Sequence, residues 1–232
     1  MKKIVRSIVV GILSVMTAAV LVGCSADNAK SDSNENSNES SNVNNSSEVK
    51  LSGLSVKEFS QDELLTGKHY VEIEVKDYGT MTVELDADIA PITVTNFVQL
   101  ASQGFYDGLT FHRVKDGFMI QGGDPLGIGL GNPGYTIKGE FADNGIENSI
   151  SLTPGAIAMG RTSNNMDSAG CQFFICQIDC SPLDGQYAGF GYVIDGFEIV
   201  DAIAKNTPVI DGNGTVAKEN QPVINSIKVV QK

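Results

Sequence analysis

The chain has 232 residues and a formal net charge of −12. Residues 51–232 hold 11 Lys or Arg and 23 Asp or Glu, whereas residues 1–50 hold five of each. This acidic balance argues against nucleic acid as a partner, because nucleic-acid binding requires a positive surface. We interpret the charge as favouring solubility rather than one specific basic partner. About 180 residues suffice for one domain with a sizeable core, and we place that domain at residues 51–232.

The N-terminus has the pattern of an export signal. Three basic residues among the first six precede an apolar run at residues 8–22. A run of about 15 residues is shorter than the roughly 20 that a membrane-spanning helix needs. We therefore predict a secretory signal peptide at residues 1–23, with an uncleaved anchor helix as the alternative. The run ends in Leu21, Val22, Gly23 and Cys24, which resemble the lipobox of bacterial lipoproteins. That resemblance implies a lipid on Cys24 that anchors the protein to the cell membrane on its extracytoplasmic side.

Residues 24–50 are predicted to form a flexible tether behind the lipidated cysteine. Between positions 25 and 49, 15 of 25 residues are Ser or Asn, and Ala and Val are the only apolar types. Such a segment cannot bury enough apolar surface to offset the conformational entropy lost on folding. A coil of this length spans roughly 25–30 Å, which would hold the domain clear of the lipid headgroups.

The domain opens with the pattern of a β-hairpin. Residues 71–75 and 81–85 alternate apolar with polar side chains, as strands with one buried face do. Asp77, Tyr78 and Gly79 lie between them as turn residues. We therefore expect the first two strands to pair directly.

The remaining pattern predicts two helices and further short strands. One helix begins at Pro91 and ends before Gly104, and the second spans residues 197–205. The further strands are expected at residues 109–114, 118–122, 156–159, 172–177, 191–194 and 223–230. Many short strands with two helices favour a mainly β fold, a closed antiparallel barrel whose ends the helices cap.

The cysteines of the domain give no sign of a disulfide or metal site. Cys171 and Cys176 lie on one predicted strand, about 16 Å apart, which is beyond the reach of a disulfide. A bridge between Cys176 and Cys180 would need a sharp turn. No second cluster of ligands lies nearby, so we interpret all three as small buried hydrophobic residues.

Strand alternation separates two neighbouring candidates for chemistry. His112 and Arg113 are adjacent on a predicted strand, so their side chains point to opposite faces. If Arg113 faces a substrate, His112 faces the barrel interior and is structural. A hydrolase that uses His112 as its base is therefore disfavoured.

The same alternation groups four further residues. Met119 shares a face with Gln121, and Gln172 shares a face with Phe174. If both faces meet Arg113, the result is a site with one guanidinium, two amides and an apolar wall. The alternative is that Met119 and Phe174 are ordinary core residues, and composition alone favours that alternative.

Several motifs in one order carry a family resemblance. The longer motifs are residues 111–114 (Phe-His-Arg-Val), 118–124 (Phe-Met-Ile-Gln-Gly-Gly-Asp) and 172–175 (Gln-Phe-Phe-Ile). Shorter matches lie at Pro91, Thr93, Asn96, Phe97, Gly104, Tyr106, Asp107 and residues 183–185. In this order and spacing they resemble the cyclophilin family of prolyl isomerases over nearly all of residues 70–230. The resemblance implies an eight-stranded antiparallel barrel capped by two helices, with no cofactor and no metal.

The resemblance also implies roles for individual residues. Arg113 falls on the catalytic arginine, and Gln121 on a second catalytic residue that positions the substrate together with Gln172. The implied proline pocket consists of Phe118, Met119, Phe174 and Leu183.

Three places depart from the family pattern. Gly160 and Arg161 occupy a substrate-binding position where an Ala-Asn pair is usual, which puts their side-chain contacts in question. Tyr187 lines the pocket where a His is common. Pro182 replaces a frequent Trp that contributes to cyclosporin binding, so we expect this protein to bind cyclosporin weakly.

These implications give the predicted function. We expect a monomeric peptidyl-prolyl cis-trans isomerase that acts on Pro-containing segments of unfolded or folding exported proteins outside the cytoplasmic membrane. The alternative is a non-catalytic cyclophilin-like module that binds Pro-containing segments without turnover.

Overall fold

The computed structural model describes residues 54–232, so the predicted signal peptide, Cys24 and the tether lie outside the described residues. The elements are β1 (Lys68–Val75), β2 (Gly79–Asp86), α1 (Pro91–Ser102), β3 (Phe111–Lys115), β4 (Met119–Gly122), β5 (Ala156–Met159), β6 (Phe173–Cys176), β7 (Gly189–Asp195), α2 (Phe197–Asn206) and β8 (Ile224–Val230). Each helix and strand predicted from the sequence is present, with bounds shifted by a few residues. Within residues 54–232, no helix has both the length and the apolar character to cross a membrane.

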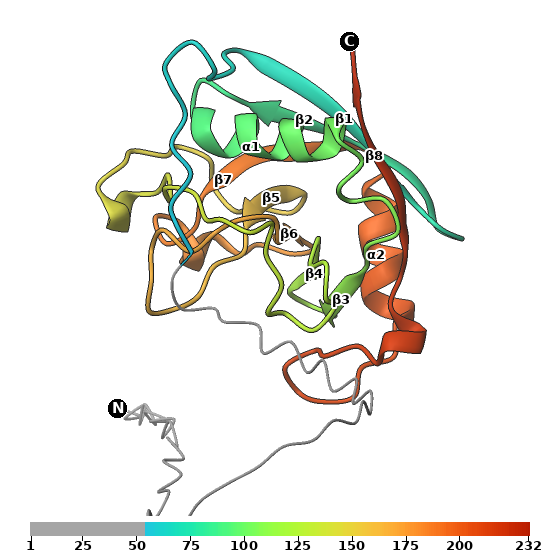
Figure 1. Ribbon diagram of the computed structural model, residues 1–232. Helices are drawn as coiled ribbons and strands as arrows, with labels where there is room; N and C mark the ends of the chain where they lie inside the picture. Colours follow the sequence, from blue (N-terminus) through green and yellow to red (C-terminus); the bar gives the residue numbers. More distant parts are fainter. Residues whose placement is uncertain (1–53) are drawn as a thin grey trace, which may run out of the picture. The chain divides into compact units, whose positions relative to one another are not determined.

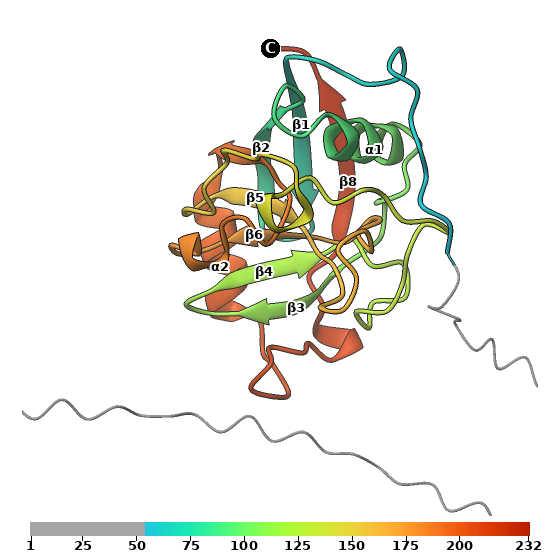
Figure 2. The same cartoon turned by 90° about the vertical axis from the view of Figure 1, so that its left-hand side faces the viewer.

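All eight strands belong to one antiparallel sheet, in the order β3-β4-β6-β5-β7-β2-β1-β8. The sheet curls around an apolar interior, and the two helices lie on different sides of it (Figures 1 and 2). Helix α1 packs against β2 and β8, whereas α2 packs against β2, β3 and β4. The helices therefore cover the interior at two places, as the pattern predicted.

An aromatic cluster fills the interior beneath α1. Phe97 points from α1 into the sheet, and its ring centre lies 5.1 Å from that of Tyr106, 5.5 Å from Phe173 and 5.1 Å from Phe190. All four side chains are fully buried. Burying a large side chain of this kind stabilises the fold by about 1.5–3 kcal/mol, so this cluster fixes α1 against the sheet.

The prediction of a closed barrel is wrong, because the ladder is open between β3 and β8. These two edges meet only at an isolated bridge between Thr110 and Val223. Beyond that bridge, residues 214–216 occupy the outer edge of β3: the Val114 amide donates to the Gly214 carbonyl, and the Val216 amide to that of His112. A strand edge can pair with one neighbour only, so β8 cannot close the barrel along β3.

The strands β4, β5 and β6 bury side chains on both faces. On β6, Phe173 and Ile175 enter the main core, whereas Phe174 and Cys176 belong to a second, smaller cluster on the opposite face. On β4, Met119 belongs to that second cluster too. Alternation along a strand thus separates the core from a second apolar layer.

A buried carboxylate from a distant loop caps helix α1. Glu140 accepts hydrogen bonds from the backbone N–H groups of Ile92 (3.0 Å) and Thr93 (2.8 Å) and from the Thr93 hydroxyl (2.6 Å). No side chain at the preceding Ala90 caps the helix. The first N–H groups of a helix lack partners within it, so Glu140 supplies the missing acceptor.

Replacing Glu140 with Ala should lower the free energy of unfolding by about 2–3 kcal/mol at pH 7, since buried donors lose their partner. Burial raises the pKa of Glu140, although its hydrogen bonds with Thr93 and Ile92 oppose that shift. A raised pKa in the folded state means that the carboxyl contributes most stability below its unfolded pKa. The difference between wild type and variant should therefore shrink as the pH rises through the folded pKa.

Denaturant unfolding at several pH values measures this difference. The exposed Glu147 on the same loop is the matched control, and Glu147→Ala should change stability by no more than about 0.5 kcal/mol. Equal stability of the two variants would show that Glu140 does not cap α1.

Candidate active site

The strand register brings the predicted site residues onto one face of the sheet. Arg113 on β3 pairs with Gln121 on β4, Gln121 pairs with Phe174 on β6, and Phe174 pairs with Ala158 on β5. Side chains that lie directly opposite each other on antiparallel strands share a face. The four residues therefore form one row across four strands, on the face opposite the main core.

Arg113 stands at one end of this row and is held by two protein acceptors. Its Nε donates to the carbonyl oxygen of Asn213 at 2.8 Å, and its Nη1 donates to Gln121 Oε1 at 3.2 Å. A longer contact joins its Nη1 to Met119 Sδ at 4.0 Å, so two of the five N–H donors of a guanidinium remain for a ligand. Burial lowers the pKa of Arg113, while the nearby Tyr187 and Asp211 oppose the shift; an arginine remains charged in proteins regardless.

Asn213 is a contact of Arg113 that the sequence analysis did not predict. It lies on the segment that covers the open edge of β3, and Asp211 fixes this segment by accepting bonds from the Asn213 and Thr215 amides and from the Thr215 hydroxyl. The signal available in the sequence was the Asp-Gly-Asn-Gly run at residues 211–214, which indicates a turn but not its partner. The departure from a closed barrel thus provides the carbonyl that orients Arg113.

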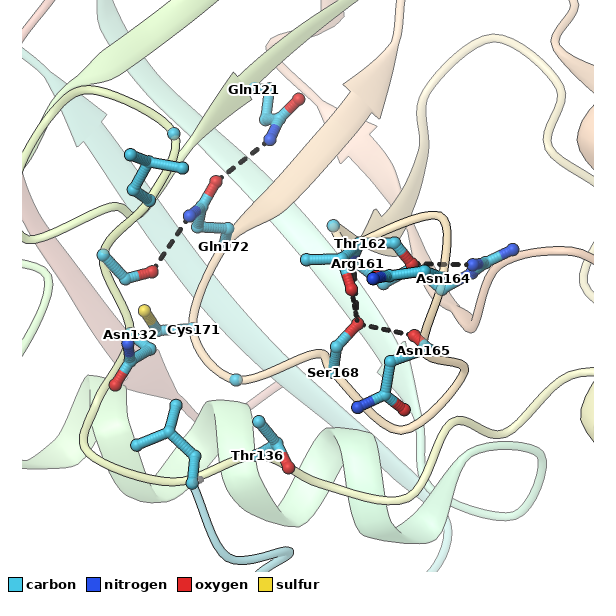
Figure 3. A pocket seen from close by; sticks show the side chains of 16 residues that line it. Gln121, Asn132, Thr136, Arg161, Thr162, Asn164, Asn165, Ser168, Cys171 and Gln172 are labelled. Carbon is cyan, nitrogen blue, oxygen red and sulfur yellow. Dashed lines mark hydrogen bonds between the residues drawn. The ribbon is translucent and has the colours of Figure 1, made fainter. Parts of the chain in front are cut away.

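A chain of side-chain amides continues from Arg113, and Figure 3 shows its link between Gln121 and Gln172. Gln121 Nε2 donates to Gln172 Oε1 at 3.1 Å, and Gln172 Nε2 donates to the carbonyl oxygen of Gly131 at 2.9 Å. Each amide fixes the orientation of the next, because a glutamine has distinct donor and acceptor ends. Arg113 and Gln121 are therefore positioned by hydrogen bonds before any ligand is present.

An apolar pocket of about 200 Å³ lies beside Arg113. Phe174 and Tyr187 meet edge to face at 5.5 Å within its wall. The lining residues are Arg113, Phe118, Met119, Gln121, Gly160, Arg161, Phe174, Leu183 and Tyr187. Every predicted site residue of the domain except Gln172 lines this pocket, so the fold brings these residues together around one cavity.

A second, larger hollow of about 540 Å³ adjoins the apolar pocket, and Gln172 lies there instead. Gln121, Gly160 and Arg161 line both cavities. Four polar residues lie on one side of the hollow: Thr162, Asn164, Asn165 and Ser168 (Figure 3). These four residues were not predicted from the sequence, because the sequence of a loop does not show which cavity the loop borders.

His112 is buried, with 4% of its surface exposed, and it does not line the pocket beside Arg113. A bulge lies between Phe111 and Arg113, which lets Phe111 pack in the main core while Arg113 lines the pocket. A methyl group added to Gly129 would lie 3.7 Å from His112 Nε2, so the ring lies beside this glycine. That His112 faces the barrel interior stays a prediction. Burial lowers the pKa of His112, which favours its neutral form.

Residues 54–232 provide neither a reactive thiol nor a metal centre in this region. Cys171, Cys176 and Cys180 are buried and unpaired. Burial raises the pKa of Cys171 to about 12 and also raises the pKa of Cys176, so both thiols stay protonated and unreactive. Among residues 54–232, no three His, Cys, Asp or Glu side chains are placed to hold a metal ion.

Fold, site and sequence agree on one class of protein. Residues 70–230 match the family described as cyclophilin type peptidyl-prolyl cis-trans isomerase. The chain is 43% identical over 145 residues to peptidyl-prolyl cis-trans isomerase B of Bacillus subtilis, covering 62% of this chain and 92% of that protein. It is 40% identical over 145 residues to a peptidyl-prolyl cis-trans isomerase of Helicobacter pylori, covering 62% and 85%.

Solved structures give the same result. The crystal structure of a cyclophilin type peptidyl-prolyl cis-trans isomerase of Cryptosporidium parvum, in the presence of the dipeptide Ala-Pro, superposes with a TM-score of 0.62 and 30% identity. The superposition covers 70% of this chain and 99% of the Cryptosporidium parvum chain. The chain belongs to the cyclophilin-type family of peptidyl-prolyl cis-trans isomerases.

Proposed function

We propose that this cyclophilin-type isomerase acts on X-Pro bonds of exported proteins and assists their folding outside the cytoplasmic membrane. The observation that carries the catalytic part is the position of Arg113. Its guanidinium is fixed by Asn213 and Gln121 at the rim of an apolar pocket, with two donors free. Such a pocket can hold a proline ring while a donor lies within reach of the prolyl nitrogen.

The reaction needs no nucleophile, since no covalent bond is broken. Amide resonance opposes rotation with a barrier of about 18–20 kcal/mol, so an X-Pro bond isomerises in tens to hundreds of seconds without help. At the twisted transition state the resonance is lost, and the prolyl nitrogen becomes pyramidal and basic. A donor aimed at this nitrogen binds the transition state better than the planar ground state, which is what catalysis requires.

The residues of the pocket divide this work between them. Phe174, Met119 and Leu183 hold the proline ring, so the preceding carbonyl is the part that turns. Arg113 donates to the prolyl nitrogen, and Gln121 holds the guanidinium and binds substrate backbone. An acceleration of 10⁴–10⁵-fold requires about 5.5–7 kcal/mol. A fixed charged donor in a partly dry pocket, with a positioned substrate, can supply that amount.

The export part of the proposal is supported by the N-terminal sequence. A basic start, a short apolar run and the lipobox-like residues before Cys24 precede the Ser- and Asn-rich segment. A lipid on Cys24 would hold the isomerase at the membrane surface, where newly exported chains emerge and begin to fold. We expect its clients to be exported proteins whose folding rate is limited by isomerisation of an X-Pro bond.

Replacing Cys24 with Ser tests the anchor directly. Wild-type protein should incorporate labelled palmitate and lose its signal, whereas the variant should incorporate none and should keep its signal uncleaved. Ser25→Ala is the matched control and should behave as wild type. Equal palmitate labelling of wild type and Cys24→Ser would contradict the anchor, while leaving the isomerase activity untouched.

A further inference from the structure

Arg161 stands where the apolar pocket meets the larger hollow. It lines both cavities, together with Gln121 and Gly160. Among the described residues that line the two cavities, Arg113 and Arg161 are the only charged ones. Residues 51–232 have a charge of −12, yet no carboxylate from the described part of the chain borders either cavity.

The Arg161 guanidinium is held in place by the protein. Its Nε donates to the carbonyl oxygen of Gln186 at 2.8 Å. Its Nη1 donates to the carbonyl oxygen of Thr162 at 3.0 Å, a bond drawn in Figure 3. Its Cζ lies 5.1 Å from the ring centre of Phe141 and 4.8 Å from that of Tyr187. These contacts restrain a side chain that would otherwise lose much rotamer freedom on binding a ligand.

The held guanidinium keeps donors that no protein group uses. Two of its five N–H bonds are taken, so three remain. The side chain is partly exposed and therefore accessible to a ligand in either cavity. A planar guanidinium with free donors matches the geometry of a carboxylate.

We propose that Arg161 forms an anion subsite, which binds an Asp or Glu side chain of the client within three residues of the proline. Three extended residues span about 10 Å, a distance that suits two cavities with a shared wall. The net negative charge of the domain disfavours acidic clients at long range, and the subsite selects a carboxylate at one position against that background. This inference rests on the proposed isomerase function and adds a substrate preference to it.

Isomerisation of matched peptides tests the subsite. One peptide set carries a single Glu at each of the three positions on either side of the proline, and the reference set carries Gln instead. At one position, wild type should show kcat/KM about 5–10-fold higher for Glu than for Gln, as charged hydrogen bonds allow. In about 1 M salt this ratio should fall only in part, because a partly buried contact pair is screened much less than exposed charges.

The variant Arg161→Gln should bring the Glu-to-Gln ratio to within about twofold of one. A loss of rate that is common to both peptides leaves the ratio unchanged. The ratio therefore distinguishes binding of a carboxylate by Arg161 from a purely structural role of Arg161 in the pocket wall. Lys115→Ala removes an exposed charge outside both cavities and should retain the wild-type ratio.

Two outcomes would overturn the subsite. A wild-type ratio near one at every position would do so, and so would an unchanged ratio in Arg161→Gln. Absence of isomerisation of all peptides by wild type would instead refute the proposed function itself.

Discussion

Replacing Arg113 with Ala should reduce kcat/KM for X-Pro isomerisation by about 10²–10³-fold, which is the usual cost of losing a donor aimed at transition-state charge. The fold should survive, because the guanidinium lies on the outer face of the sheet and not in the main core. Arg113→Lys should recover only part of the rate. Lysine keeps the charge but cannot bond Asn213 and Gln121 while still presenting donors in a fixed plane.

Lys115→Ala provides the matched control for this prediction. Lys115 lies two residues further along the same strand, is exposed and borders neither cavity. Its loss should leave kcat/KM within about twofold of wild type and stability within about 0.5 kcal/mol. An Arg113→Ala protein that is folded and retains most of the wild-type rate would remove the basis of the mechanism.

Gly191→Ala should be the most destabilising single methyl addition in the sheet, at about 3 kcal/mol or more. Gly191 pairs with Leu85 on one side and Ile157 on the other. An added methyl would overlap the carbonyl oxygen of Glu84, which is backbone and cannot rotate away. The strand β7 would have to move away from β2, and β5, which pairs with β7, would move too.

Gly212→Ala is the control for a glycine that meets no neighbour. A methyl there finds nothing within 4 Å, so stability should change by no more than about 0.5 kcal/mol. Urea unfolding of both variants measures the difference. Equal midpoints would mean that β2 and β7 accommodate the methyl without separating.

Much of the site could be predicted because two local rules govern it. Alternation along a strand correctly placed Met119 with Gln121, and separated Phe174 from Phe173. Adding the family motifs brought these faces to Arg113, and the strand register then put them in one row. Short motifs specify which face a residue occupies, and this is why the list of pocket residues was nearly complete.

The parts that were not predicted depend on contacts between distant segments. The prediction of a closed barrel was wrong because residues 214–216 pair with the edge of β3. The pattern of a strand does not show which distant segment will pair with its edge. Alternation also fails at the start of β3, because a bulge lets Phe111 pack in the core while Arg113 lines the pocket. Glu140 was missed as the cap of α1, since it lies 48 residues from Ile92.

Exchange spectroscopy on a short X-Pro peptide tests the central claim most directly, namely that the pocket beside Arg113 turns the prolyl bond. The full chain, added in substoichiometric amount, should produce exchange cross-peaks between cis and trans resonances within seconds. Uncatalysed exchange takes tens of seconds or more. Arg113→Ala should bind the peptide but produce far weaker cross-peaks. Peptide binding by the wild type without any cis–trans exchange would contradict the account and make the protein a binding module.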